Sequence, residues 1–242
     1  MNISRRIAII GVPTNSSGLS NGVARAPTAL RRAGLLQALN DLGTVRDDGD
    51  VLFEPPTPDR DSASGMIAPQ SLVSMVLGVR VAVRRALGDG YFPLVIGGDC
   101  PLLLGCLAAV RTFHNRVGLL FVDGHEDAYP PHASLTGETA DMELGLALGR
   151  SLTTVPRELR LLLPLIRPRD VVLLGPRDGA LLNAEGVRSV AGDVSVVNDL
   201  ALRNGDIRAL TNKALRDIHA HEQPWWLHTD LDVLATEALP AV

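Results

Sequence analysis

Short, continuous runs of apolar residues recur along the chain and alternate with longer stretches of helical periodicity. The runs that we predict to be strands are residues 6–12, 92–96, 117–122, 170–174, 189–197 and 224–228, the last leading into Thr229. Strands that are apolar throughout, rather than at alternate positions, are typical of a parallel sheet covered on both faces.

The stretches between these runs have the spacing of amphipathic helices. We predict helices over residues 26–38, 70–87, 101–113, 142–148, 156–165 and 206–220. Such alternation of strands and helices predicts a single α/β domain over residues 1–242, with a doubly wound, mostly parallel sheet. Residues 51–64 are polar and rich in proline, so we expect a surface loop there.

Composition and charge exclude several classes of partner. The chain has 242 residues, with 23 Lys and Arg against 27 Asp and Glu and no basic stripe. This balance argues against nucleic acid or an anionic membrane as the main partner. No apolar run approaches the roughly 20 residues needed to span a bilayer, and the run at residues 7–10 is too short for a signal peptide. With only two cysteines a disulfide framework is not expected, so we predict a cytoplasmic protein.

Charged side chains follow three of the predicted strands, at the point where each strand ends. They are Asp99 and Cys100 in "VIGGDC", Asp123, His125 and Asp127 in "FVDGHED", and Asp230 and Asp232 in "WWLHTDLDV". Ligands of open parallel sheets bind beyond the carboxyl ends of the strands. Because alternate side chains of an extended chain point the same way, the second and third sets would gather four carboxylates and one imidazole in one crevice.

Carboxylates this close repel one another unless a cation lies between them. An oxygen-rich set with one imidazole suits one or two divalent ions such as Mn²⁺. The alternative is that each acidic pair caps a helix or faces solvent separately. For a single Asp-x-Asp that alternative is the better interpretation, but two such sets at the ends of apolar runs favour a metal site.

These motifs resemble those of the arginase family, the ureohydrolases that include agmatinase and formimidoylglutamase. The resemblance covers nearly the whole chain. Its motifs are the glycine-rich opening "IGVPTNSSGLSNGVARAPTALRRAGLLQAL", "DDGDV" in the family's second strand region, "IGGDC" for Gly-Gly-Asp-His, "DGHED" for Asp-Ala-His-x-Asp and "TDLDVL" for Asp-x-Asp. The resemblance implies a three-layer α/β/α fold and an enzyme with two Mn²⁺ ions. It also implies hydrolysis of linear amidines or guanidino compounds by a metal-bridged hydroxide that attacks the amidine or guanidinium carbon, and assembly into a homo-oligomer.

The resemblance further implies roles for individual residues. The metal ligands would be Asp123, His125, Asp127, Asp230 and Asp232. Of these, Asp123 and Asp230 would bridge the two ions, and Asp127 would also be catalytic, carrying a proton to the leaving amine. The positions that fall in or near the substrate pocket are Tyr129, Thr136 and Asp178.

The chain departs from the family pattern at several positions. Cys100 stands where the family has its first metal ligand, a histidine. A thiolate there would favour Zn²⁺ or Fe²⁺; alternatively Cys100 is a buried thiol and that metal position is weak or empty. Ala140 replaces a histidine thought to act in proton transfer, and Tyr129 lies near the position of an asparagine that recognises the α-carboxylate of arginine. L-arginine is therefore not the first substrate that we expect.

The family's eighth strand, with a substrate-contacting glutamate near it, would fall beyond Val242. We therefore expect the sequence to be a fragment or a truncated product, or else an inactive protein or one that needs a partner. Three functions stay open. They are a two-metal amidinohydrolase with a changed substrate pocket, a catalytically degenerate metal-binding protein with an interaction or regulatory role, and a hydrolase of another C–N bond with one zinc ion on Cys100.

Other polar residues have simpler interpretations. We expect His228 to be a core histidine with satisfied hydrogen bonds, and His132 to lie on a solvated loop. Glu126 should point away from its neighbours, to the surface or an outer shell of the site. Cys106 should be a core residue of the helix that follows Cys100. Asp99 could hold a turn or orient a ligand.

Overall fold

The computed structural model describes residues 5–219, 223–235 and 237–239. Its strands are β1 (Arg5–Val12), β2 (Gly43–Asp50), β3 (Phe92–Gly97), β4 (Gly118–Val122), β5 (Val171–Leu174), β6 (Ser195–Val197) and β7 (Trp225–Thr229). They form a three-stranded sheet in the order β2-β1-β3 and a four-stranded sheet in the order β6-β5-β4-β7. Neighbouring strands are parallel in both sheets.

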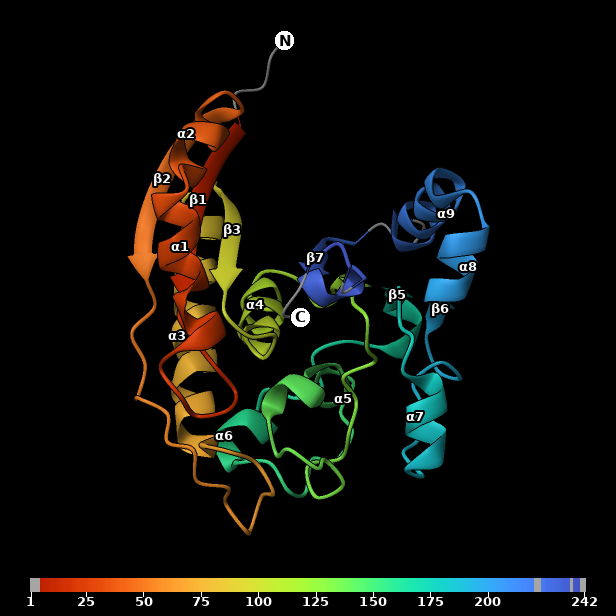
Figure 1. The fold of residues 1–242 in the computed structure, drawn as a ribbon. Helices are drawn as coiled ribbons and strands as arrows, with labels where there is room; N and C mark the ends of the chain where they lie inside the picture. Colours follow the sequence, from red (N-terminus) through yellow and green to blue (C-terminus); the bar gives the residue numbers. More distant parts are fainter. Residues whose placement is uncertain (1–4, 220–222, 236, 240–242) are drawn as a thin grey trace.

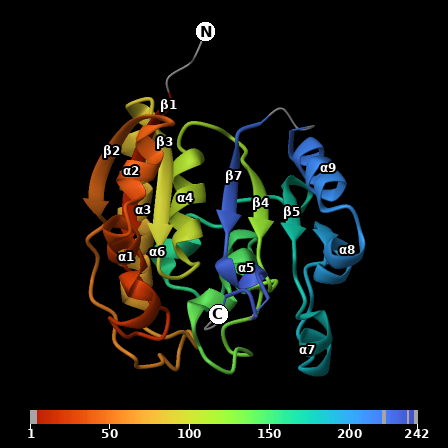
Figure 2. The same ribbon diagram turned by 45° about the horizontal axis from the view of Figure 1, so that its top comes forward.

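The predicted α/β class with parallel strands is confirmed. In the described part of the chain the strands form two sheets, where a single sheet was expected. β3 is an edge strand of the first sheet and β7 is an edge strand of the second, and these two edges face each other. Among the residues that the structure describes, no backbone hydrogen-bond ladder joins them. Figure 2 shows the strands pointing in one direction, so their carboxyl ends lie on the same side of the molecule. This common side is where the predicted acidic motifs meet.

The helices of the described residues flank these sheets. They are α1 (Ala26–Arg32), α2 (Leu35–Asn40), α3 (Pro69–Gly88), α4 (Leu102–Val110), α5 (Glu143–Ala147), α6 (Arg157–Arg160), α7 (Gly179–Ala184), α8 (Asp199–Asn204) and α9 (Ile207–His219). Short 3-10 turns lie at Gly22–Arg25, Thr139–Asp141, Pro168–Asp170 and Leu231–Val233. None of the described helices combines the length and the apolar character that a membrane crossing needs.

The predicted helices are present with changed limits. The helix expected over 26–38 is divided into α1 and α2 by Gly34, whose φ of +93° is a left-handed conformation that favours glycine. The helix expected over 156–165 is reduced to the single turn of α6. α7 and α8 were not predicted, and the expected end of the last helix at residue 220 lies outside the described residues.

β2 was not among the strands predicted from apolar runs, because its sequence "GTVRDDGD" is polar. It is an edge strand that pairs with β1 alone, and edge strands commonly carry charge. The charges are paired locally: Arg31 of α1 donates to Asp47 and Asp50 of β2, and Arg46 lies against Asp48.

α4 lies between the two sheets and supports the site. Its residues are all buried, as expected of a helix that is apolar on every side. Figure 1 places α4 between β3 and β7, packed beside α3. Cys106 is completely buried in this core, which confirms the prediction for that residue. Because Cys100 comes just before α4, this packing fixes its position at the end of β3.

Candidate metal centre

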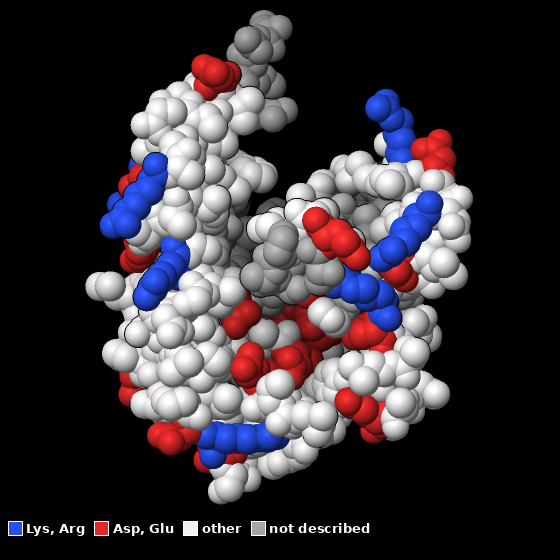
Figure 3. Space-filling view, in the orientation of Figure 1, with Lys and Arg blue, Asp and Glu red and all other residues white. Residues whose placement is uncertain are grey.

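A pocket of about 380 Å³ opens at the carboxyl ends of β3, β4 and β7. Its lining residues are Asp99, Cys100, His125, Asp127, Tyr129, Leu135, Thr136, Ala140, Asp141, Asp178, Leu181, Glu185, Asp230 and Asp232. None of the described residues that line it is a lysine or an arginine. Figure 3 shows the acidic side chains gathered in a hollow near the centre of this face, with basic side chains around it. The pocket is therefore a strongly acidic concavity.

The end of β4 supplies the first group of acidic residues. Asp123 is 1% exposed, and its Oδ1 accepts a hydrogen bond from the backbone N–H of His125 at 2.8 Å. β4 ends at Val122, so the chain from Asp123 onward is not extended, and Asp127 has a φ of +42°. The alternation argument for this segment was therefore wrong. A turn, rather than a strand, brings Asp123, His125 and Asp127 together.

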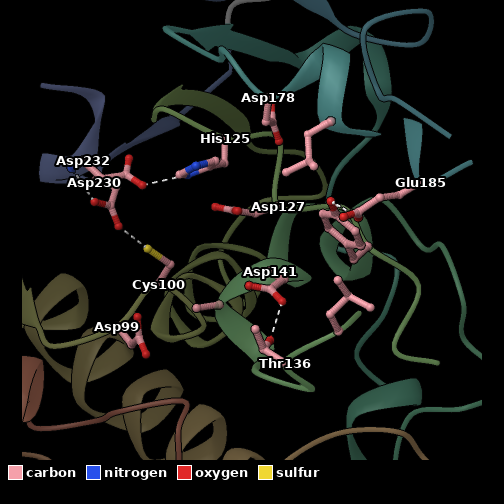
Figure 4. A pocket seen from close by; sticks show the side chains of 14 residues that line it. Asp99, Cys100, His125, Asp127, Thr136, Asp141, Asp178, Glu185, Asp230 and Asp232 are labelled. Carbon is pink, nitrogen blue, oxygen red and sulfur yellow. Dashed lines mark hydrogen bonds and ion pairs between the residues drawn. The ribbon is translucent and has the colours of Figure 1, made fainter. Parts of the chain in front are cut away.

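The end of β7 supplies the second group, and hydrogen bonds connect it to the other two strand ends. Asp232 accepts from the backbone N–H of Gly124 at 2.9 Å and lies 2.7 Å from Nδ1 of His125. Asp230 accepts from the thiol of Cys100, with 2.7 Å between Sγ and Oδ2. Figure 4 shows the contact between Asp232 and His125 and the contact between Asp230 and Cys100. The ends of β3, β4 and β7 are thus joined through side chains at one point.

Glycines permit this close approach. A Cβ added to Gly98 would lie 2.0 Å from the carbonyl oxygen of Thr14, so only glycine fits between β3 and the loop that follows β1. A Cβ on Gly124 would lie 2.2 Å from the guanidinium of Arg177, which donates to the backbone oxygen of Asp232 at 2.6 Å. The glycines of "IGGDC" and "DGHED" therefore shape the site.

Three groups of side chains in the described residues have the spacing of a metal site, and each contains Asp123. They are Cys100 with Asp123, Glu143 and His228; Asp123 with His125 and Asp127; and Asp123 with Asp230 and Asp232. Within each group the potential ligand atoms lie within 4.8 Å of one another. Asp123 therefore lies at the centre of the acidic constellation.

The buried carboxylates need a compensating charge. Burial, with further repulsion from Asp127 and Asp232, raises the pKa of Asp123 to about 11. Burial likewise raises the pKa values of Asp127 and Glu143, which are close neighbours of each other. Within the part of the chain that the structure describes, Oδ2 of Asp123 and both carboxylate oxygens of Glu143 have no hydrogen-bond partner. A divalent cation would satisfy these oxygens and hold the groups ionised, so the residues present fit a metal.

His125 and Asp232 form the more exposed part of the constellation. The hydrogen bond to Asp232 is the main cause that raises the pKa of His125, while partial burial opposes it. For Asp232, burial raises the pKa, but hydrogen bonds from His125 and from the N–H of Gly124 outweigh burial, so its pKa is lowered. Asp232 is therefore held as a carboxylate at neutral pH, as a ligand of a cation must be.

The three predicted substrate residues line the same pocket. The hydroxyl of Tyr129 donates to Glu185 at 2.7 Å, and that of Thr136 donates to Asp141 at 2.6 Å. Asp178 accepts from the backbone N–H of Glu126 at 3.1 Å. In Figure 4, Glu185 lies across the pocket from Asp230 and Asp232. The side of the pocket away from the acidic strand ends is therefore polar as well.

Sequence reasoning missed Glu143, the first residue of α5, which is completely buried. Two other expectations need correction. His228 is buried, but no described residue forms a hydrogen bond with its Nε2, so it is not a satisfied core histidine. Glu126 is buried rather than at the surface, and accepts from Ser189 Oγ at 2.7 Å and from the N–H of Val190 at 2.6 Å.

The carboxylate of Asp99 joins two loops. Its Oδ2 accepts a hydrogen bond from the backbone N–H of Ser16 at 2.7 Å. That bond joins the segment after β3 to the loop after β1. His132 is exposed and does not line the pocket.

Comparison with known proteins identifies the class. The model of the arginase family matches residues 5–242 of the chain. An arginase of Staphylococcus aureus (strain MRSA252) is 30% identical over 182 residues, which are 74% of this chain and 59% of that protein. An arginase of Bacillus subtilis (strain 168) is 29% identical over 179 residues, 72% of this chain and 58% of that protein. The aligned part thus spans less than two thirds of these relatives.

Solved structures agree on the fold. The arginase from Bacillus caldovelox superposes with a TM-score of 0.84 at 24% identity, covering 98% of this chain and 79% of that one. The formimidoylglutamase from Bacillus subtilis superposes with a TM-score of 0.67 at 18% identity, covering 98% and 68%. The arginase-like α/β fold predicted from the sequence is confirmed. The chain therefore belongs to the arginase family.

Proposed function

We propose that this chain is a metal-dependent hydrolase of C–N bonds in linear amidines or guanidino compounds. The observation that carries the proposal is the convergence of the acidic ends of β4 and β7 on the buried Asp123. Five residues would hold two divalent ions: Asp123, His125, Asp127, Asp230 and Asp232. Mn²⁺ is the ion expected in this family, and Cys100 beside Asp230 makes Zn²⁺ or Fe²⁺ the other choice.

Such ions supply, when bound, a water activated for hydrolysis at neutral pH. This chain's own residues manage the charge and the proton. Asp127 lines the pocket with its carboxylate beside Glu143, and we assign it the transfer of a proton to the leaving amine. Ala140 lines the same pocket and can neither donate nor accept a proton. Of these two residues, only Asp127 can transfer the proton.

The lining of the pocket favours a cationic substrate. Seven of its described residues are carboxylic and none is a lysine or an arginine, so a guanidinium or amidinium group finds complementary charge. A substrate carboxylate would find no cation among the lining residues. We therefore favour a guanidino or amidine compound without a carboxylate near the reacting group. Tyr129, Thr136 and Asp178 are the side chains that we assign to substrate contact.

The same proposal includes the setting of the enzyme. Cys100 and Cys106 are both free thiols, in keeping with a reducing compartment, and we infer a cytoplasmic location. The partner is a small molecule rather than nucleic acid or a membrane. Homo-oligomeric assembly is inferred from the family alone.

Activity measurements on the metal-loaded protein test the proposal. The protein is loaded with Mn²⁺ or Zn²⁺ and incubated with a panel of guanidino and amidine compounds, and release of urea or ammonia is measured. We expect turnover of at least one cationic compound, and a decrease of about 10²–10⁴-fold in Asp127→Asn. Glu158→Gln, on the exposed surface of α6, is the matched control and should keep full activity. Absence of turnover with metal bound would overturn the proposal.

A second function has specific support. The thiol of Cys100 is buried and bonded to Asp230, and Ala140 offers no proton in the pocket. Both features suit a metal-binding protein that has lost catalysis and acts through interaction or regulation. Stoichiometric metal binding without turnover of any compound in the panel would favour this alternative.

A further inference from the structure

A group of buried side chains that includes the pocket-lining Cys100 is not used in full by the proposed function. Its members are Cys100, Asp123, Glu143 and His228, and their ligand atoms lie within 4.8 Å of one another. All four residues are buried, with Glu143 at 0% exposure. Cys100 follows β3, Asp123 follows β4, His228 lies on β7 and Glu143 begins α5. Four separate elements thus place one potential ligand each at a single point.

We propose that Cys100, Asp123, Glu143 and His228 form a zinc site, with one sulfur, one nitrogen and two carboxylate ligands. This inference rests on the proposed function, because it specifies the ion and the ligands at one of the two metal positions. Asp123 is shared with the other two groups and would join this site to them. Glu143 and His228 are absent from the ligand set given above.

The donor set matches zinc better than manganese. Zinc binds thiolate, imidazole and carboxylate in tetrahedral sites, and thiolate ligands select it over Mn²⁺. Bonds of 2.0–2.3 Å in that geometry put ligand atoms about 3.3–3.8 Å apart. The 4.8 Å limit of the cluster is wider by about 1–1.5 Å, a difference that side-chain rotations on binding would close.

Unsatisfied polar atoms point to a missing ion. Both oxygens of Glu143, Oδ2 of Asp123 and Nε2 of His228 are buried and have no hydrogen-bond partner among the described residues. Buried polar atoms are nearly always paired, so several orphans at one point need a common explanation. These atoms are oxygens of two carboxylates and a ring nitrogen of a histidine. One divalent cation would satisfy all of them, whereas a water molecule could not donate to so many acceptors.

The surroundings hold these side chains in place. The ring of His228 stacks on Phe121 of β4, with ring centroids 4.9 Å apart and planes 14° from parallel. Gly98 lies against the backbone of Thr14, and this close contact fixes the chain segment that leads to Cys100. On binding, the Cys100 thiol loses its proton to solvent and sulfur takes up the metal, which removes its hydrogen bond to Asp230.

Titration with Co²⁺, a spectroscopic substitute for zinc, tests the site in the full chain. Coordination by Cys100 should produce a sulfur-to-cobalt charge-transfer band in the near ultraviolet, and added Zn²⁺ should abolish it. Cys100→Ser should lose the band. Glu143→Gln and His228→Asn should keep the sulfur but bind Co²⁺ at least about tenfold more weakly, since even loss of an outer-shell partner costs 10- to 100-fold. Circular dichroism establishes that each variant is folded.

Cys106→Ala is the matched control, because Cys106 lies on α4 in the core and belongs to none of the metal groups. It should keep the band and the affinity. A folded wild-type protein that binds Co²⁺ without a charge-transfer band would overturn the inference, as would unchanged affinity in both Glu143→Gln and His228→Asn. These readouts need no turnover, so a band without hydrolysis would defeat the proposed activity and leave the zinc site intact.

Discussion

The thiol of Cys100 donates a hydrogen bond to Asp230, across 130 positions of sequence and a distance of 2.7 Å. The two residues follow β3 and β7, strands of different sheets that share no ladder in the described residues. A side-chain contact at the candidate metal centre thus links the two sheets. Binding of an ion at this point should therefore affect the stability of the fold as well as its chemistry.

Removal of metal should destabilise the protein. An ion that binds only the folded chain stabilises it by about 2.7 kcal/mol when present at 100 times its dissociation constant. We expect the melting temperature to fall on treatment with a chelator and to recover when Mn²⁺ or Zn²⁺ is added in excess. Differential scanning calorimetry measures both changes. Identical melting curves with and without metal would contradict a metal centre at the junction of the sheets.

Asp123→Asn should separate metal binding from folding. Burial, with repulsion from Asp127 and Asp232, raises the pKa of Asp123, which favours its neutral form when no metal is bound, and asparagine resembles that form in size and charge. The amide oxygen can still accept from the N–H of His125. We expect the free energy of unfolding without metal to change by less than about 1 kcal/mol. Stabilisation by added metal should disappear. Urea unfolding with and without Zn²⁺ tests this, and a wild-type metal response in the variant would refute it.

The ion pair between Arg116 and Asp170 should matter more than a surface pair. Asp170 is 1% exposed and accepts from the guanidinium at 2.6 Å and 3.3 Å. Arg116→Ala leaves this carboxylate buried and unpaired, so we expect a loss of about 3 kcal/mol. Arg203→Ala, in the exposed pair with Asp199, is the control and should cost about 0.5 kcal/mol or less. Equal shifts of the two denaturation midpoints would be evidence against this account.

Gly98→Ala should damage both the fold and the site. The added Cβ would lie 2.0 Å from the oxygen of Thr14 and 2.8 Å from that of Val23, and both are backbone atoms. We expect a loss of about 1–3 kcal/mol in stability and weaker metal binding, because Cys100 must move. Gly192→Ala, where a Cβ meets nothing within 4 Å, should stay within about 0.5 kcal/mol of wild type. Chemical denaturation and a Co²⁺ titration of both variants decide the matter.

Much of the fold could be predicted from the sequence because buried parallel strands are apolar throughout. β2 escaped this signal, since an edge strand need not be apolar and its charges pair with Arg31 and with one another. The division into two sheets could not be predicted either. Whether two strands pair depends on their positions in space, and the apolar pattern of β3 and β7 is the same whether or not they meet.

The candidate site was predicted in part. Asp123, Asp127 and Asp232 were found because acidic residues at the ends of apolar runs are conspicuous. Glu143 was missed because it falls within a helical stretch, where an acidic residue is ordinarily on the solvent side. Its signal was an acidic residue inside the apolar run "MELGLAL", with an apolar neighbour on each side. His228 was a comparable signal, because it is a polar residue that directly follows the apolar residues of β7.

Anomalous diffraction from crystals grown with Mn²⁺ and Zn²⁺ tests most directly the claim that Asp123 is the centre of a metal site. We predict anomalous density that contacts Asp123 and at least one further side chain from each of the β4 and β7 ends. Anomalous density that contacts only other residues would contradict the account. So would the absence of any anomalous density in crystals in which Asp123 has the same neighbours as described above.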